Sequence, residues 1–182
     1  MTAPRLPAPL RALAALAVGF GLGGASTVDI PKIPVRVAFA ADSEGSSAET
    51  LLDVRDDALY AVNLTFRYDE AGHPPNDRDR VWHLVGGAEK DLRTGQWQVP
   101  GAPLTLEVVL RRQGAGDETD ILRQKVVQPR LSSWGAGTLT ARLGTARLSP
   151  GRYHLVVRSL HAAPTLRDVP TCIGVARAYA GK

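Results

Sequence analysis

Apolar and polar residues alternate along several short stretches of the chain. Residues 58–68 show the pattern most clearly, because every second side chain is apolar: Tyr60, Val62, Leu64, Phe66 and Tyr68. A period of two places such side chains on one face of a β-strand. The same alternation marks residues 35–40, 104–111, 121–127, 139–143 and 153–157, and the small and apolar residues 172–179 end the pattern. The chain is therefore expected to form a series of short β-strands.

Turn-forming residues separate these stretches. Residues 114–117 predict the loop of a hairpin, and Pro150 and Gly151 come directly before the strand that contains Tyr153. Residues 42–50 are small and polar, so we expect a loop or insertion there. Short strands joined by Gly- and Pro-containing turns predict an all-β fold, an antiparallel β-sandwich.

One stretch has the features of a helix instead. Asn76 is a favourable N-cap residue, and Asp77 and Asp79 would lie in the first turn, where carboxylates complement the helix dipole. A short apolar stripe runs toward the end of residues 77–85, and two glycines follow it. We therefore expect one short helix beside the sandwich.

The N-terminus has the features of a secretory signal. Arg5 and Arg11 are positive, residues 13–22 are apolar, and small residues suited to cleavage follow. The apolar run is too short to cross a bilayer, and no later segment is long and apolar enough to do so. We expect residues 1–25 to be a signal peptide and residues 26–182 to form one β-sandwich domain, periplasmic or secreted, without an integral membrane segment.

The charge of the chain argues against nucleic-acid binding. The formal net charge of +4 falls to +2 once the two arginines of the signal are removed. Nucleic-acid binding favours a clustered basic face with interleaved aromatic residues, and the arginines here are spread along the chain. The one modest cluster is interpreted as the solvated side of two strands and consists of Arg111, Arg112, Arg123, Lys125 and Arg130.

The sequence contains no recognisable catalytic, metal or cofactor motif. A G-x-S-x-G elbow is absent, no two histidines have the spacing of a zinc site, and no glycine-rich loop lies between a strand and a helix. Cys172, the single cysteine, is interpreted as a buried thiol. We therefore expect a protein that is not an enzyme, with no cofactor and no metal.

Tryptophan is the remaining feature that suggests binding. The chain has three, Trp82, Trp97 and Trp134. An exposed tryptophan can anchor a partner protein or stack on a sugar ring. Trp97 lies in a loop-like stretch and is the one to test for exposure, whereas Trp82 and Trp134 are interpreted as covering an edge of the core. The candidate partner-binding residues are Trp97, Trp82, Asp77 and Arg78.

The C-terminal half carries short motifs that are specific in combination. They are a Ser-Trp-Gly turn, a Pro-Gly-x-Tyr strand entry, and a Leu- and Pro-rich return to a last strand. The motif residues are Trp134, Gly135, Pro150, Gly151, Tyr153, Pro164, Pro170 and Gly174. This combination resembles a family of small proteobacterial envelope proteins known as a domain of unknown function, number fifty-six twenty-five, over about residues 35–175.

The resemblance implies an exported β-sandwich and supplies no activity. Many members look like lipoproteins with a cysteine directly after the signal, but Ala25 and Ser26 stand at that place here, so no lipid anchor is expected. We interpret the motif residues as architectural. Pro150 and Gly151 suit a tight turn that leads into a strand, and Trp134 would close one end of the sandwich.

Three functions remain open from the sequence. The first is a non-enzymatic protein that binds a partner protein in the cell envelope, with an immunity or accessory role toward a secreted effector by analogy with other small exported proteins. The alternative is a carbohydrate- or surface-ligand-binding module that uses Trp97 or Trp82. The third is a hydrolase using a serine with His154 or His161, which requires a histidine nitrogen within hydrogen-bond reach of a serine or an acid in a cleft.

Overall fold

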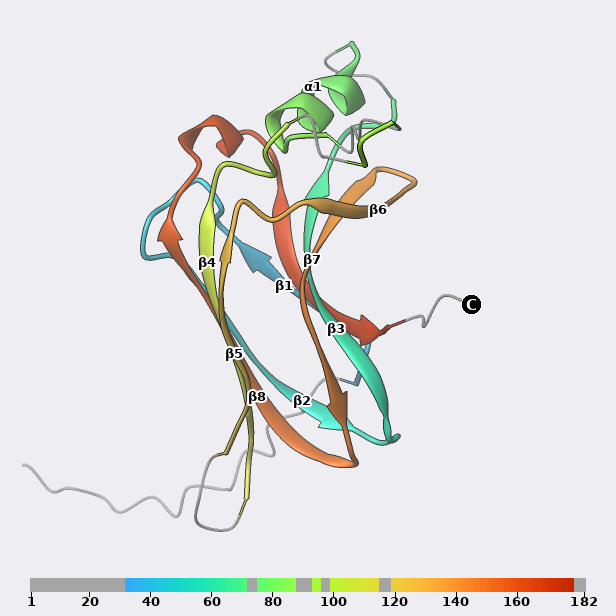
Figure 1. Cartoon of the computed structure of the whole chain (residues 1–182), viewed down its shortest axis with the longest axis vertical. Helices are drawn as coiled ribbons and strands as arrows, with labels where there is room; N and C mark the ends of the chain where they lie inside the picture. The colour runs from blue at the N-terminus through green and yellow to red at the C-terminus, as the bar shows by residue number, and fades with distance from the viewer. Residues whose placement is uncertain (1–31, 72–74, 88–92, 96–98, 115–118, 179–182) are drawn as a thin grey trace, which may run out of the picture.

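The chain folds into two antiparallel β-sheets that pack face to face (Figure 1). The structure is a computed structural model that describes residues 32–71, 75–87, 93–95, 99–114 and 119–178. The first sheet has five strands in the order β1-β9-β3-β7-β6, and the second has four in the order β2-β8-β4-β5. The predicted antiparallel β-sandwich with a short helix is confirmed. The predicted signal, residues 1–25, lies outside the described residues.

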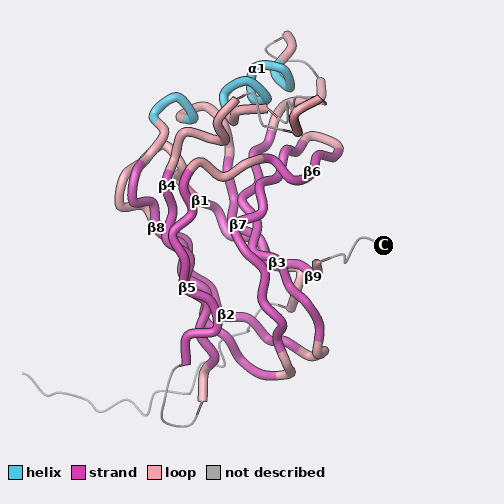
Figure 2. The backbone as a smooth tube through the Cα atoms, viewed as in Figure 1, coloured by secondary structure: helices cyan, strands magenta, loops and turns pink. Residues whose placement is uncertain are grey.

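Strands make up most of the described chain (Figure 2). The five-stranded sheet consists of β1 (Val35–Phe39), β9 (Thr171–Arg177), β3 (Ala58–Arg67), β7 (Thr138–Leu148) and β6 (Leu131–Gly135). The four-stranded sheet consists of β2 (Ser47–Val54), β8 (Gly151–His161), β4 (Thr105–Arg112) and β5 (Thr119–Val127). An α-helix, α1 (Asp77–Leu84), and a short 3-10 helix, η1 (Pro164–Leu166), lie at the same end of the sandwich.

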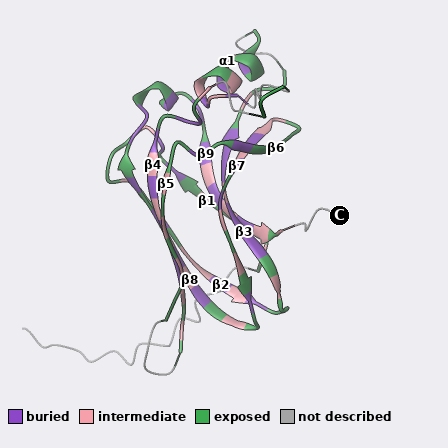
Figure 3. Ribbon diagram, in the orientation of Figure 1, coloured by how far each residue is buried: buried purple, intermediate pink, exposed green. Residues whose placement is uncertain are grey.

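The hydrophobic core lies between the two sheets, as Figure 3 shows by the buried inner positions of the strands. Leu64 and Phe66 of β3 and Leu106 of β4 have no exposed surface. Tyr153 of β8 is also buried, and its hydroxyl donates to the carbonyl oxygen of Ser149 at 2.8 Å. The alternation along residues 58–68 thus corresponds to a strand with one face in the core. The hydroxyl of the buried Tyr153 is satisfied by a hydrogen bond, as buried polar groups usually are.

Strand β2 begins inside the segment that the sequence predicted as a loop. The prediction for residues 42–50 is wrong from Ser47 onward. Ala48 and Leu52 of β2 are buried in the core, and Ala48 pairs with Val157 of β8. The sequence of β2 does not show a clear apolar–polar alternation, because the inward-facing Ala48 is small and the residues on either side of it are polar.

Strand β6 replaces the predicted Ser-Trp-Gly turn. Trp134 pairs with Leu139 and Gly135 pairs with Thr138 of β7, so the motif is extended and the chain turns only after it. β6 is an edge strand in which Leu131 is the buried residue. An edge strand with little contact to the core needs no apolar alternation, which is why its sequence resembles a loop.

Helix α1 lies where the sequence predicted it but lacks the predicted cap. Asn76 has a left-handed backbone with φ of 62°, and its side chain makes no capping hydrogen bond. Asparagine tolerates this conformation better than most residues. Val81 and Val85 are buried and attach the helical segment to the core. Across the described residues, no helix combines the length and apolar character needed to cross a membrane.

Candidate partner-binding site

Helix α1 and strand β6 bring two tryptophans and an arginine together. The ring centroids of Trp82 and Trp134 are 5.8 Å apart and the ring planes cross at 71°. The guanidinium carbon of Arg78, one helical turn before Trp82, lies 5.9 Å from the centroid of the Trp82 ring. An edge-to-face aromatic pair contributes about 0.5–1.5 kcal/mol, and a cation–π contact at an exposed site contributes about 0.5–1 kcal/mol. We call Arg78, Trp82 and Trp134 the tryptophan cluster.

Trp134 is the exposed member of the tryptophan cluster. It keeps 61% of its surface exposed, so the prediction that it covers the core and closes one end of the sandwich is wrong. The cause is its position on edge strand β6, where the register shifts between Leu131 and Ser133. Trp82 is partly buried against the core, as predicted. Trp97, the tryptophan singled out for an exposure test, lies outside the described residues.

Asp77 fastens the start of helix α1 to the chain that follows β3. Its carboxylate accepts a hydrogen bond from the backbone N–H of Asp69 at 2.8 Å. It also forms an ion pair with the guanidinium of Arg80 at 2.7 Å. The Asp77 side chain is only 7% exposed. The hydrogen bond from Asp69, followed by the contact with Arg80, holds the pKa of Asp77 below its ordinary value. Asp77 therefore acts here by positioning the helix that carries Arg78 and Trp82.

An apolar groove of about 330 Å³ opens beside Trp82. Its lining includes Trp82, Leu84 and Pro100. Gly86 also lines the groove; its φ is 83°, and a Cβ there would stand 1.9 Å from the carbonyl oxygen of Pro100. This position therefore accepts only glycine. The groove is lined by apolar side chains, lies where the backbone of Gly86 packs closely against that of Pro100, and adjoins the tryptophan cluster.

The comparisons with known proteins place the chain in a family. Residues 33–177 match the family described as a domain of unknown function, DUF5625. The chain belongs to this family. The resemblance inferred from the sequence motifs is thereby confirmed. No curated protein matches the chain.

The fold of this DUF5625 member is similar to a known crystal structure. That structure, of a protein from Sulfurospirillum deleyianum, aligns with a TM-score of 0.64 and 15% sequence identity, over 80% of this chain and 97% of the other. At this identity the likeness shows the shared fold alone.

Most family-motif residues of this DUF5625 member lie at turns or near strand ends, whereas Gly174 lies in the middle of β9. The carbonyl oxygen of Gly135 accepts a hydrogen bond from the Tyr68 hydroxyl at 2.9 Å, which ties β6 to the end of β3. The carbonyl oxygen of Pro170 accepts from the backbone N–H of Arg67 at 2.9 Å. Pro164 begins η1, a helical turn that the sequence did not predict. These contacts give Gly135, Pro164 and Pro170 structural roles.

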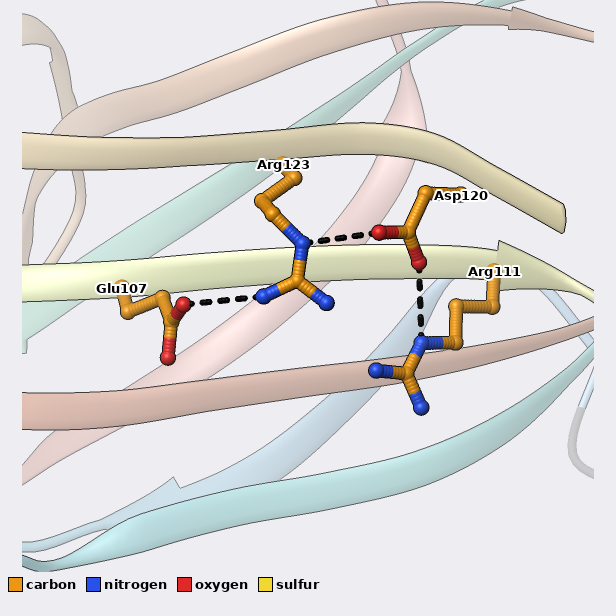
Figure 4. Close-up of polar contacts among 4 residues, drawn as sticks. All are labelled: Glu107, Arg111, Asp120 and Arg123. Carbon is orange, nitrogen blue, oxygen red and sulfur yellow. Dashed lines mark hydrogen bonds and ion pairs between the residues drawn. The ribbon is translucent and has the colours of Figure 1, made fainter.

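Two arginines of the predicted basic cluster, Arg111 and Arg123, are paired with acids (Figure 4). Arg123 donates to Asp120 at 2.7 Å and to Glu107 at 3.1 Å, and Arg111 donates to the same Asp120 at 2.9 Å. Hydrogen bonds from Arg123 and then Arg111 hold the pKa of Asp120 below its ordinary value. This face therefore carries a network of exposed ion pairs that compensates the charges of Arg111 and Arg123. The sequence-based interpretation of this cluster was the solvated side of two strands.

The described residues also contain one histidine–carboxylate contact. Nε2 of His154 lies 2.6 Å from Oε1 of Glu49, and the His154 side chain is only 18% exposed. Within the described ranges, no three histidines, cysteines or carboxylates gather as metal ligands. Cys172 is free and half-buried, whereas the sequence interpretation was a buried thiol.

Proposed function

We propose that this protein is an exported, non-enzymatic protein that binds a partner protein through the tryptophan cluster and the adjoining groove. The observation that carries the proposal is the 61% exposure of Trp134 beside Trp82 and Arg78. Tryptophan and arginine are the residues most enriched among those that dominate protein interfaces. We favour an immunity or accessory role toward a secreted effector, because the N-terminus resembles a secretory signal.

The geometry favours a protein over a sugar as the occupant of this surface. Sugar rings stack on flat aromatic faces, but the rings of Trp82 and Trp134 cross at 71° and present no common plane. Arg78 also lies over the Trp82 ring. An apolar groove next to an exposed tryptophan instead suits side chains from a partner, packed into the groove while Trp134 is buried against the partner's surface.

Truncation of Trp134 tests the proposal. Affinity capture from the envelope fraction of the source cells, followed by mass spectrometry, identifies the partner, which is then purified. We expect Trp134→Ala to weaken the dissociation constant of the purified pair by about 30- to 1,000-fold, the range of a central interface residue. Ile121→Ala is the matched control, because Ile121 is 38% exposed and lies near the start of β5, on the other sheet and toward the end of the sandwich opposite helix α1 (Figure 1).

Two outcomes would overturn the proposal. One is a partner complex whose affinity falls equally in Trp134→Ala and Ile121→Ala, which would place the interface elsewhere. The other is the absence of any partner that forms a stable complex with the purified protein. The immunity role has its own test: co-expression with the partner in the periplasm should restore growth, and Trp134→Ala should lose this protection while the protein still accumulates.

A further inference from the structure

The outer face of the five-stranded sheet carries a row of polar residues bounded by two arginines. The strand register aligns Arg36 of β1, Gly174 of β9, Asn63 of β3 and Arg142 of β7 side by side. With neighbouring strands about 4.8 Å apart, the Cα atoms of the two arginines are about 14 Å apart. The Cγ atom of Arg36 lies 3.7 Å from the point where a Cβ at Gly174 would stand, so this arginine leans over the glycine toward the middle of the row.

This face is hollowed where the row crosses the sheet. A hollow of about 280 Å³, at the small end of the range for ligand pockets, includes the four residues of the row in its lining. Its lining also includes Thr65, from the next outward position of β3. Thr65 is only 9% exposed, and its hydroxyl makes no hydrogen bond to the residues that the structure describes. The Thr65 hydroxyl is therefore available to form a hydrogen bond with a polar group of a ligand in the hollow.

The charge of the hollow is positive. None of the described residues that line it is acidic. Arg177 at its margin is paired with Asp56, whereas Arg36 and Arg142 have no ion-pair partner among the described residues. This differs from the opposite sheet, where Arg111 and Arg123 are bound to carboxylates. Two uncompensated arginines around a hollow favour an anionic ligand, and a guanidinium binds a carboxylate through paired hydrogen bonds.

We propose that this hollow binds an acidic sugar unit, with its carboxylate on Arg142 or Arg36 and its hydroxyls on Asn63 and Thr65. Amide and hydroxyl side chains both donate and accept hydrogen bonds, as sugar hydroxyls do. An acidic peptide fits less well, because the hollow crosses the face of the sheet, where the backbone groups of β9 and β3 are already paired. This site is separate from the tryptophan cluster, and its ligand is independent of the proposed partner.

The test uses the full purified protein in calorimetric titrations at 50 mM NaCl. The probes are trigalacturonate, glucuronate and sialyllactose, with methyl-esterified trigalacturonate, hexaglutamate and inorganic phosphate as comparisons. We expect at least one acidic sugar to bind with a millimolar or tighter dissociation constant. Its affinity should fall about 10-fold in Arg142→Gln and about 3- to 10-fold in Thr65→Val, the cost of one charge-assisted and one neutral hydrogen bond.

Matched variants separate this site from the rest of the molecule. Arg167→Gln removes an exposed arginine outside the hollow, and Trp134→Ala alters the tryptophan cluster. Both should leave sugar affinity unchanged. Thr65→Val keeps the shape of the side chain, and its thermal midpoint reports whether the fold is retained. The proposal is overturned if none of the acidic sugars binds below 10 mM, if the methyl ester binds equally well, if hexaglutamate or phosphate binds in their place, or if Arg167→Gln weakens binding as much as Arg142→Gln.

Discussion

The substitution Asp77→Ala tests how helix α1 is held in place. The Asp77 carboxylate accepts from the backbone N–H of Asp69 at 2.8 Å and from Arg80 at 2.7 Å. A hydrogen bond to a buried charged group contributes about 1.5–3 kcal/mol, and the Arg80 contact counts for less because that side chain is 38% exposed. We therefore expect a loss of about 2 kcal/mol in the free energy of unfolding, measured by urea denaturation, and a fall of about 4–8 °C in the melting temperature.

The effect of Asp77→Ala should also depend on pH. Because the folded protein lowers the pKa of Asp77, this carboxylate stabilises the fold above its unfolded pKa and loses that contribution as the pH falls through the lowered value. The stability difference between wild type and Asp77→Ala should thus be constant from pH 7 to about pH 5 and shrink toward pH 3. Asp79→Ala, an exposed first-turn acid, is the control and should cost about 0.5 kcal/mol. Equal costs for the two variants at pH 7, or an undiminished difference at pH 3, would refute the reasoning.

Two further pairs of substitutions test the packing. Phe66→Ala should cost about 3–5 kcal/mol in urea denaturation because the ring has no exposed surface, whereas Leu160→Ala, at a side chain 44% exposed, should cost less than about 1 kcal/mol. Gly86→Ala should lower the melting temperature more than Gly45→Ala, since both glycines have positive φ but only Gly86 has backbone within 1.9 Å of an added Cβ. Equal effects within either pair would contradict the described packing.

The strands with one face in the core were predictable from the sequence. β3 and β4 alternate because Phe66 and Leu106 face the opposite sheet while their neighbours face outward. Two strands were missed for a physical reason. In β2 the inward Ala48 is small, and in edge strand β6 only Leu131 is buried, so neither segment shows a strong period of two.

The candidate site was only partly predictable. Helical spacing places Arg78 and Trp82 on neighbouring turns, so their contact follows from the sequence once the helix is recognised. The contact between Trp82 and Trp134 joins residues far apart in the chain and depends on how β6 pairs with β7. Arg36 and Arg142 are also far apart in the chain, and their alignment on one face of the sheet depends on the strand register. A tryptophan between serine and glycine, as in Ser133-Trp134-Gly135, was the one local signal of an exposed ring.

Site-specific photo-crosslinking in living cells tests the central claim most directly. A photoreactive phenylalanine analogue replaces Trp134 in one strain and Ile121, which is exposed near the opposite end of the sandwich, in a second strain. If the tryptophan cluster is the docking surface, illumination should join the protein to one discrete envelope protein from position 134 and should give no crosslink from position 121. Crosslinks of equal yield from both positions, or none from position 134, would contradict a partner-binding function at this end of the sandwich.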